Sequence, residues 1–265
     1  MEQKKHTFAI CAYKESEYLE DCIRSLEDQK QDTQIIIVTS TPNDYISALA
    51  NKYELPLFIN TGKRGITEDW NFAYKMANTN YVTIAHQDDL YYQDYAFEAI
   101  RYLDKHSNTL IYFTDYAEIR NNATIYDNRL LRIKRIMLSP LKIKKFGNSI
   151  FIRRRILSLG CPICCPSVTF VKSNLPEMVF TSGFRSDEDW EAWEKLSKLK
   201  GRFGYNSKVL MGHRIHDGSE TSAIINDNVR NKEDLQMFNK FWPLPIAKFL
   251  TKIYANSEKS NELNE

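Results

Sequence analysis

Two adjacent carboxylates, Asp88 and Asp89, follow a short apolar segment at residues 81–85. This segment is rich in β-branched residues and predicts a buried strand. Two anions at the end of a buried strand are costly unless a cation or hydrogen-bond donors meet them. Mg²⁺ and Mn²⁺ bind carboxylates together with substrate phosphates, so the pair indicates a metal site for a phosphorylated substrate. The alternative is that both residues only turn the chain and cap the following helix.

A second acidic group, Ser186-Asp187-Glu188-Asp189, opens a helix predicted from the apolar residues that follow it. The dipole of a helix favours an ionised carboxylate at its N-terminus. A carboxylate within hydrogen-bond reach of a hydroxyl can act as a general base. Simple helix capping by these residues is the alternative.

Two histidines stand at the end of the last predicted strand, residues 209–216. His216, and with less support His213, could complete a metal shell or contact a diphosphate, because a neutral imidazole suits Mn²⁺. Each could equally be a hydrogen-bonded structural histidine.

Strands and helices must position these groups, and up to residue 113 they alternate with short connections. Strands are predicted at residues 8–11, 35–38, 57–59, 81–85 and 110–113. This order is typical of a mostly parallel sheet with helices on both faces. Ligands of such sheets lie at the carboxyl ends of the strands. The loops there contain the candidate substrate-binding residues Ala12, Tyr13, Glu15, Ser40, Thr41 and Gly65.

The alternation stops after residue 113, and residues 115–180 are predicted to be irregular or hairpin-like. No acidic residue lies between Asn128 and Pro176, a window with eleven Lys and Arg residues, although the whole chain has a net charge of only +2. Such a block usually faces phosphates, nucleic acid or an anionic membrane. Within residues 128–155 the basic residues interleave with Leu and Ile, so we expect an amphipathic surface that binds an anionic membrane. The alternative is apolar residues packed on the sheet with solvated charges.

Length and composition predict a soluble globular protein, with 265 residues, 43% hydrophobic and 26% charged. We expect a domain at residues 1–225, including the basic segment 128–160, a helical extension at 226–255 and a disordered tail at 256–265. No apolar segment reaches the length of a membrane span, and no export signal precedes the first strand. The five cysteines are therefore expected to be reduced thiols of a cytoplasmic protein. Cys161 and Cys164 have CxxC spacing, but no second pair of zinc ligands lies at zinc-finger distance from them.

Four blocks of the chain, in this order, resemble the family 2 glycosyltransferases of GT-A fold. They are residues 8–15, Gly65–Ala73, His86–Asp89 and Ser186–Glu191, followed by an Arg-x-His element at Arg214–His216. The similarity spans roughly residues 7 to 220. It implies an α/β, Rossmann-like, mostly parallel sheet with helices on both faces, elaborated by the basic segment and the C-terminal helices.

The resemblance also implies an activity: inverting transfer of a sugar from a nucleoside diphosphate, with UDP favoured, to a hydroxyl of a cell-surface polysaccharide or other glycan. A lipid-linked acceptor and peripheral attachment to the inner face of the membrane would suit such work. By the resemblance, Asp89 binds Mn²⁺ or Mg²⁺, with His216 as a further ligand, and Asp88 and Asp69 contact the nucleotide. Asp189 is then the catalytic base, with Glu188 as the next candidate.

The chain departs from the family pattern at two places. The second strand is followed by Thr39-Ser40-Thr41 where the family usually has an acidic pair, and His86 stands at the first acidic position of the metal motif. The alternatives are a nucleotidyltransferase of similar fold and a non-catalytic scaffold that binds nucleotides or anions. No glycine-rich triphosphate loop follows the first strand, and no aromatic platform accompanies the basic window, so no nucleic-acid partner is expected.

Overall fold

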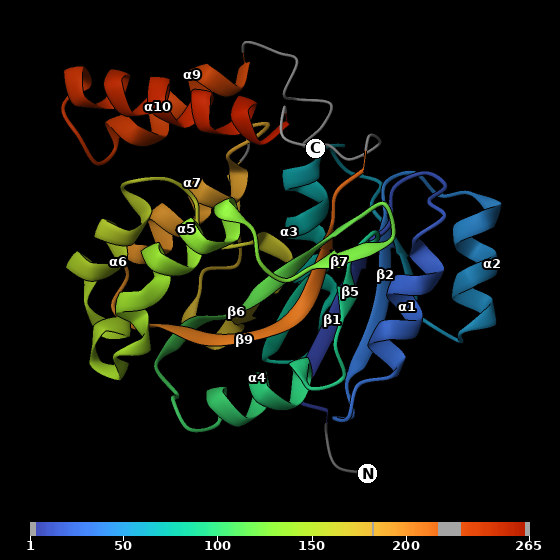
Figure 1. The fold of residues 1–265 in the computed structure, drawn as a ribbon. Coiled ribbons are helices and arrows are strands. Elements are labelled where there is room, and N and C mark those ends of the chain that lie inside the picture. The colour runs from blue at the N-terminus through green and yellow to red at the C-terminus, as the bar shows by residue number, and fades with distance from the viewer. Residues whose placement is uncertain (1–3, 182, 217–228, 263–265) are drawn as a thin grey trace.

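The computed structural model describes residues 4–181, 183–216 and 229–262. The described strands form one nine-stranded mixed sheet in the order β3-β2-β1-β4-β8-β6-β9-β5, with β7 paired to β6 (Figure 1). They are β1 (His6–Cys11), β2 (Gln34–Thr39), β3 (Leu57–Ile59), β4 (Tyr81–His86), β5 (Leu90–Tyr91), β6 (Thr109–Arg120), β7 (Ala123–Ile125), β8 (Val168–Val171) and β9 (Arg202–Arg214).

Helices cover both faces of this sheet. They are α1 (Leu19–Glu27), α2 (Asp44–Lys52), α3 (Ile66–Met76), α4 (Tyr95–Leu103), α5 (Arg129–Leu138), α6 (Ile150–Leu157), α7 (Glu188–Ser197), α9 (Val229–Asn239) and α10 (Leu244–Glu262). Short 3-10 turns are η1 (Ser139–Lys142), η2 (Lys144–Asn148), η3 (Cys165–Ser167) and η4 (Lys172–Asn174).

The first half of the sheet agrees with the sequence prediction. Strands β3, β2, β1 and β4 are parallel neighbours. Along β1, Phe8 and Ile10 pack in a core with α1 and α2, whereas Ala9 packs in a second core with α3 and α7. Apolar side chains on both faces are what a covered parallel strand requires. Because the four strands are parallel, their carboxyl ends form one edge of the sheet, where the loops that follow them meet.

The second half of the sheet was only partly predicted. β8 is antiparallel to both β4 and β6 and separates them. β6 continues to Arg120, seven residues beyond the predicted end, because its polar residues find partners inside the protein. Asp115 accepts a hydrogen bond from the Tyr205 hydroxyl at 2.6 Å, and Glu118 accepts one from Asn128 at 2.8 Å. The window predicted to be irregular or hairpin-like thus contains the β6–β7 hairpin, and beyond the prediction it also contains α5, α6 and β8.

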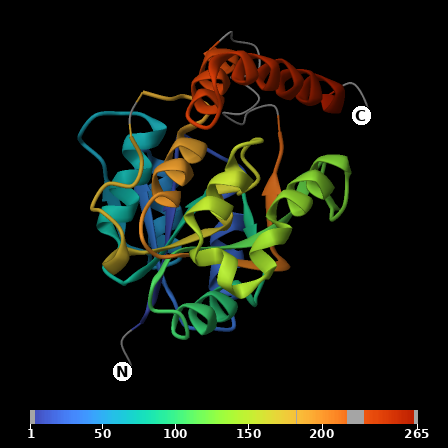
Figure 2. The ribbon, with the colours of Figure 1, turned by 90° about the vertical axis from the view of Figure 1, so that its left-hand side faces the viewer.

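The basic segment forms α5 and α6, which Figure 2 shows beside each other below the C-terminal helices. Asn128 caps α5 by accepting a hydrogen bond from the backbone of Leu131. Arg132 pairs with Asp127 at 2.6 Å, so part of the positive charge is balanced by an acidic residue just outside the window. Leu131 is buried, whereas Ile136 is exposed. This helix consequently has both a packed and an exposed apolar side.

The C-terminal extension is a pair of helices, α9 and α10, above α7 (Figure 1). Met237, Phe238 and Ala247 are buried in the same core as α7. α10 continues to Glu262, so residues 256–262, expected to be disordered, belong to a helix. The remaining three residues of that predicted tail lie outside the described part of the chain, as do residues 217–228. No described helix is both long and apolar enough to cross a membrane.

Candidate active site

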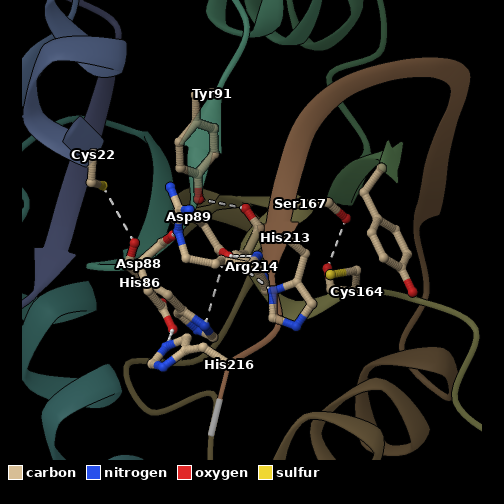
Figure 3. A network of polar contacts seen from close by, with 12 residues as sticks. Cys22, His86, Asp88, Asp89, Tyr91, Cys164, Ser167, His213, Arg214 and His216 are labelled. Carbon is tan, nitrogen blue, oxygen red and sulfur yellow. Dashed lines mark hydrogen bonds and ion pairs between the residues drawn. The ribbon is translucent and has the colours of Figure 1, made fainter. Parts of the chain in front are cut away.

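The acidic pair lies where β4 ends and β5 begins, against the end of β9. Leu90 of β5 pairs with Gly212, which brings the last residues of β9 to the pair (Figure 3). Asp89 is fully buried; its Oδ1 accepts a hydrogen bond from the backbone N–H of Arg214 at 2.8 Å and lies 2.9 Å from His213 Nδ1. Its Oδ2 accepts no hydrogen bond from any residue that the structure describes. A buried carboxylate oxygen without a hydrogen-bond donor is costly, and a bound metal ion would remove that cost. Asp89 Oδ2 therefore fits the role of a metal ligand.

Asp88 is less buried than Asp89 and faces a different histidine. Its Oδ2 lies 3.1 Å from His216 Nε2, and its backbone carbonyl accepts a hydrogen bond from Arg214 Nε at 2.9 Å. The Arg214 guanidinium stacks over the Tyr18 ring at 4.2 Å. The Arg-x-His element is thereby fixed to the acidic pair from β9.

Ligand atoms of His86, Asp88 and Asp89 all lie within 4.8 Å of one another, so these three residues could hold a divalent metal. We call them the acidic group. Burial lowers the pKa of His86 against the opposing charges of Asp89 and Asp88, so its imidazole is neutral and able to bind a metal. The predicted metal ligand His216 contacts Asp88 and is not one of the three. The nitrogen among the three belongs to His86, which stands at a departure from the family pattern.

The predicted nucleotide-binding residues line the ends of β1 and β2. Ala12 donates its backbone N–H to Val38, and Lys14 donates its own to Thr41 Oγ1 at 2.6 Å. The backbone of Tyr13 forms two hydrogen bonds with the Gln87 amide, next to the acidic pair. An open hollow here is lined by Lys14, Glu15, Thr41, Pro42, Asn43 and Arg64. The ring of Tyr13, next to Lys14 in the chain, is exposed to solvent.

The Asp69 side chain lies beside the end of β2, although the residue itself belongs to the first turn of α3. Its carboxylate accepts hydrogen bonds from Ser40 Oγ at 2.6 Å and from Asn60 Nδ2 at 2.7 Å. Gly65 precedes α3 with a φ of 146°, a conformation that residues with a side chain rarely adopt. A carboxylate thus stands beside Thr39–Thr41, where the local sequence had none.

Asp189 lies in the first turn of α7. Its Oδ1 accepts a hydrogen bond from the Trp190 backbone at 2.6 Å, and the Cys161 thiol lies 3.7 Å from Oδ2. Burial raises the pKa of Asp189. Glu188, the alternative base, is buried. Asp89 and Asp189 both raise the pKa of the Cys164 thiol beyond the effect of burial, so both carboxylates lie near the segment of residues 161–165.

Two residues with no sequence motif support these groups. Glu233 of α9 accepts hydrogen bonds from the backbone N–H groups of Arg185 and Ser186, at 2.9 and 2.8 Å, and so fixes the loop that leads into α7. Lys134 of α5 donates to the Tyr116 hydroxyl at 2.9 Å. In the sequence, Lys134 was noted only as one of the basic residues of the window 128–176. No signal in the sequence pointed to Glu233.

Comparisons with known proteins agree with this geometry. The sequence pattern of the Glycosyl transferase family 2 matches residues 7–180. No curated protein matches the chain. Among solved structures, residues 1–349 of TarS from S. aureus, in complex with UDP-GlcNAc, are 17% identical with a TM-score of 0.59, over 89% of this chain and 71% of that one. The mannosyltransferase PcManGT from Pyrobaculum calidifontis, in complex with GDP-Man and Mn²⁺, is 15% identical with a TM-score of 0.64, over 96% and 70%.

At these identities the two structures establish a shared fold, which is GT-A. The family pattern covers more than half of the chain and includes the acidic group and the loops after β1 and β2. The chain therefore belongs to glycosyl transferase family 2 and is a nucleotide-sugar-dependent glycosyltransferase.

Proposed function

We propose that the protein transfers a sugar with inversion from a nucleoside diphosphate, UDP above others, to a hydroxyl of a cell-surface polysaccharide or other glycan. The observation that supports this reaction is that two carboxylate sites lie near residues 161–165: Asp89 of the acidic group, and Asp189, whose Oδ2 lies 3.7 Å from the Cys161 thiol. A donor held at the first and an acceptor held at the second would face each other across the anomeric carbon.

The residues divide the chemistry between them. Asp189 removes the proton of the acceptor hydroxyl, whose oxygen forms the new bond to the anomeric carbon as the bond to the diphosphate breaks. A divalent metal held by His86, Asp88 and Asp89 would neutralise charge on the departing diphosphate. Cys161, whose pKa is raised by burial and by Asp189, is a neutral thiol and leaves Asp189 as the base.

The nucleotide is the least constrained part of the donor. TarS was solved with UDP-GlcNAc and PcManGT with GDP-Man. We assign the nucleotide base of the donor to the region of Tyr13, Thr41 and Asp69. The Asp69 carboxylate lies near the place where the acidic pair of the family contacts the nucleotide base. Ser40 and Asn60 already hydrogen-bond both of its oxygens, so Asp69 acts there as an oriented acceptor.

A panel of nucleotide sugars tests the function directly. Each sugar would be incubated with the protein and Mn²⁺, and slow hydrolysis would be followed by release of nucleoside diphosphate. We expect release from one nucleotide class, lost on chelation of the metal. Release of pyrophosphate from a nucleoside triphosphate would instead support a nucleotidyltransferase.

A lipid-linked acceptor and peripheral attachment to an anionic membrane complete the proposal. Exposed apolar residues support it: Ile246, Phe249 and Ile253 fall on one side of α10. Lys248 and Lys252 are exposed beside them, and no acidic residue lies between Asp234 and Glu258. Apolar and basic stripes side by side are typical of interfacial helices.

α6 adds to the same surface. Phe151 is 69% exposed, and the Arg155 guanidinium lies over both its ring and that of Trp242, just before α10. The membrane-facing surface proposed from the sequence at residues 128–155 is therefore better assigned to α6 and α10 together. In α5, by contrast, Arg132 is paired with an acidic residue and Lys134 with a tyrosine.

A further inference from the structure

The loop that leads into α7 is held by a residue of the C-terminal extension. Glu233 of α9 is only 6% exposed, and its carboxylate accepts hydrogen bonds from donors of two successive residues. The backbone nitrogen of Arg185 lies 2.9 and 3.0 Å from its two oxygens. Ser186 donates both its backbone N–H and its hydroxyl to Oε2, at 2.8 and 2.7 Å. Carboxylates accept strong hydrogen bonds, so these contacts fix residues 185 and 186 to α9.

The first turn of α7 lacks the local cap that such a turn usually has. The first backbone N–H groups of a helix have no partner inside it, and a side chain at the N-cap normally accepts from one of them. Asp187 is the N-cap residue of α7, but its side chain makes no capping hydrogen bond to the described residues. Ser186, just before it, directs its hydroxyl to Glu233. The start of α7 is therefore held by α9 in place of a cap from its own sequence.

Asp189 lies just beyond this loop, in the first turn of α7. The next residue, Trp190, is fully buried and packs edge to face on Phe238 of α9, with ring centroids 5.0 Å apart. α9 thus contacts the chain on both sides of Asp189, through Glu233 before it and through Phe238 after it. A displacement of the loop would displace the Asp189 carboxylate, because the helical backbone that joins them is regular and rigid.

We infer that Glu233 is a positioning residue for the catalytic base: through Arg185 and Ser186 it sets where α7 begins, and hence where the Asp189 carboxylate meets the acceptor. The inference rests on the proposed function, because it takes Asp189 as the base. Glu233 acts through the loop and not on the reacting atoms. The family pattern ends at residue 180, before α7 and α9, so the C-terminal extension completes an active site that this pattern only partly covers.

The test compares the rate of hydrolysis with the affinity for nucleotide in variants of the full chain. Release of nucleoside diphosphate from the nucleotide sugar that the wild type hydrolyses gives kcat, with water as the acceptor, and titration with UDP or GDP in the presence of Mn²⁺ gives the affinity. We expect Glu233→Ala to lower kcat roughly 10- to 100-fold, the scale for misplacing a reacting group by about 1 Å, with unchanged affinity. Glu233→Gln keeps one oxygen for the donors of Ser186 and should have an intermediate rate. Gln236→Ala, exposed on the same helix, is the matched control and should behave as the wild type.

A double-mutant cycle separates positioning from a general loss of stability. If Glu233 acts through Asp189, Glu233→Ala should change the rate little once Asp189→Asn has already removed the base. Leu103→Ala, in a separate core with Tyr112, lowers stability without touching this loop and should keep the wild-type kcat at a temperature where it is folded. Hydrogen exchange over residues 185–189 should become faster in Glu233→Ala and not in Leu103→Ala.

The inference would be overturned by a folded Glu233→Ala with the wild-type kcat, by an equal loss of rate in the wild-type and Asp189→Asn backgrounds, or by unchanged hydrogen exchange over residues 185–189. A loss of nucleotide affinity equal to the loss of rate would also overturn it, because Glu233 would then support the donor site. Should Glu233→Ala fail to fold, Glu233→Gln serves for the same comparisons. Failure of the proposed function would appear separately, as no hydrolysis of any nucleotide sugar by the wild type.

Discussion

The Asp89 carboxylate and the His213 imidazole lie 2.9 Å apart although 124 positions separate them in the chain. The contact joins the end of β4 to the end of β9. Burial lowers the pKa of His213, but the charge and hydrogen bond of Asp89 outweigh it, so the pKa is raised overall. His86, on the other oxygen, has a lowered pKa. The Asp89 carboxylate thus lies between His213, whose protonated form it stabilises, and His86, which is neutral and able to bind a metal.

We expect Asp89→Asn to abolish metal-dependent donor binding, because the amide is nearly isosteric but lacks the charge that a divalent metal requires. Affinity for the donor nucleotide would be measured with and without Mn²⁺. Asp94→Asn, an exposed aspartate paired with Lys30, is the control and should behave as the wild type. Undiminished Mn²⁺-dependent affinity in folded Asp89→Asn would show that the metal binds elsewhere.

Asp189→Asn should keep donor binding and lose most transfer, by about 10²–10⁴-fold, the usual effect of removing a positioned general base. Transfer rate and nucleotide affinity would be measured on the same preparation. A near wild-type rate would move the base to Glu188, and Glu188→Gln would then be the variant to examine.

Stability provides a second reading of Asp189. Its pKa is raised in the folded protein, so ionisation of this carboxyl opposes folding as pH rises above the ordinary aspartate range. We expect Asp189→Asn to raise Tm relative to the wild type at neutral pH, with the difference shrinking as pH falls below that range. A difference that does not change with pH would contradict the raised pKa.

The pH dependence of transfer should reflect the same carboxyl. The base works only when ionised, so the rate should rise with pH, with a midpoint above that of an ordinary aspartate. Lys134 lowers the pKa of Asp189, so Lys134→Met should move this midpoint further upward. Rate profiles of both proteins at saturating donor would measure the shift. A midpoint that moves downward would exclude an electrostatic contact between the two groups.

Membrane attachment predicts co-sedimentation with anionic vesicles that weakens at high salt. Replacing Ile246, Phe249 and Ile253 together by Ser should reduce it strongly, and Lys248→Gln with Lys252→Gln should reduce its dependence on salt. Ile59→Ser, at an exposed apolar residue of the edge strand β3, is the control. Equal binding to neutral vesicles, or none at low salt, would rule out an electrostatic anchor.

The sequence by itself determined the first half of the fold and the chemistry of its loops. Apolar β-branched segments such as Ile35–Val38 can be buried on both faces, and their spacing with amphipathic helices specifies a parallel sheet whose carboxyl ends meet. The carboxylates of Asp88 and Asp89 were found in this way, because charge at the end of an apolar element is a local signal, whereas Asp189 was singled out through the family resemblance. Four such blocks in order were enough to indicate the family.

Only the tertiary structure decided which side chains meet. Asp69 lies beside Ser40, and Lys134 beside Tyr116, through pairings that no spacing along the chain encodes. The polar end of β6 and the position of β8 were missed because partners from distant elements, such as Tyr205 for Asp115, satisfy those polar groups. A basic residue on an amphipathic helix has the same pattern whether it faces lipid or a cleft. Packing of Leu131 of α5 into the core, and not the sequence pattern, brought Lys134 to the hydroxyl of Tyr116.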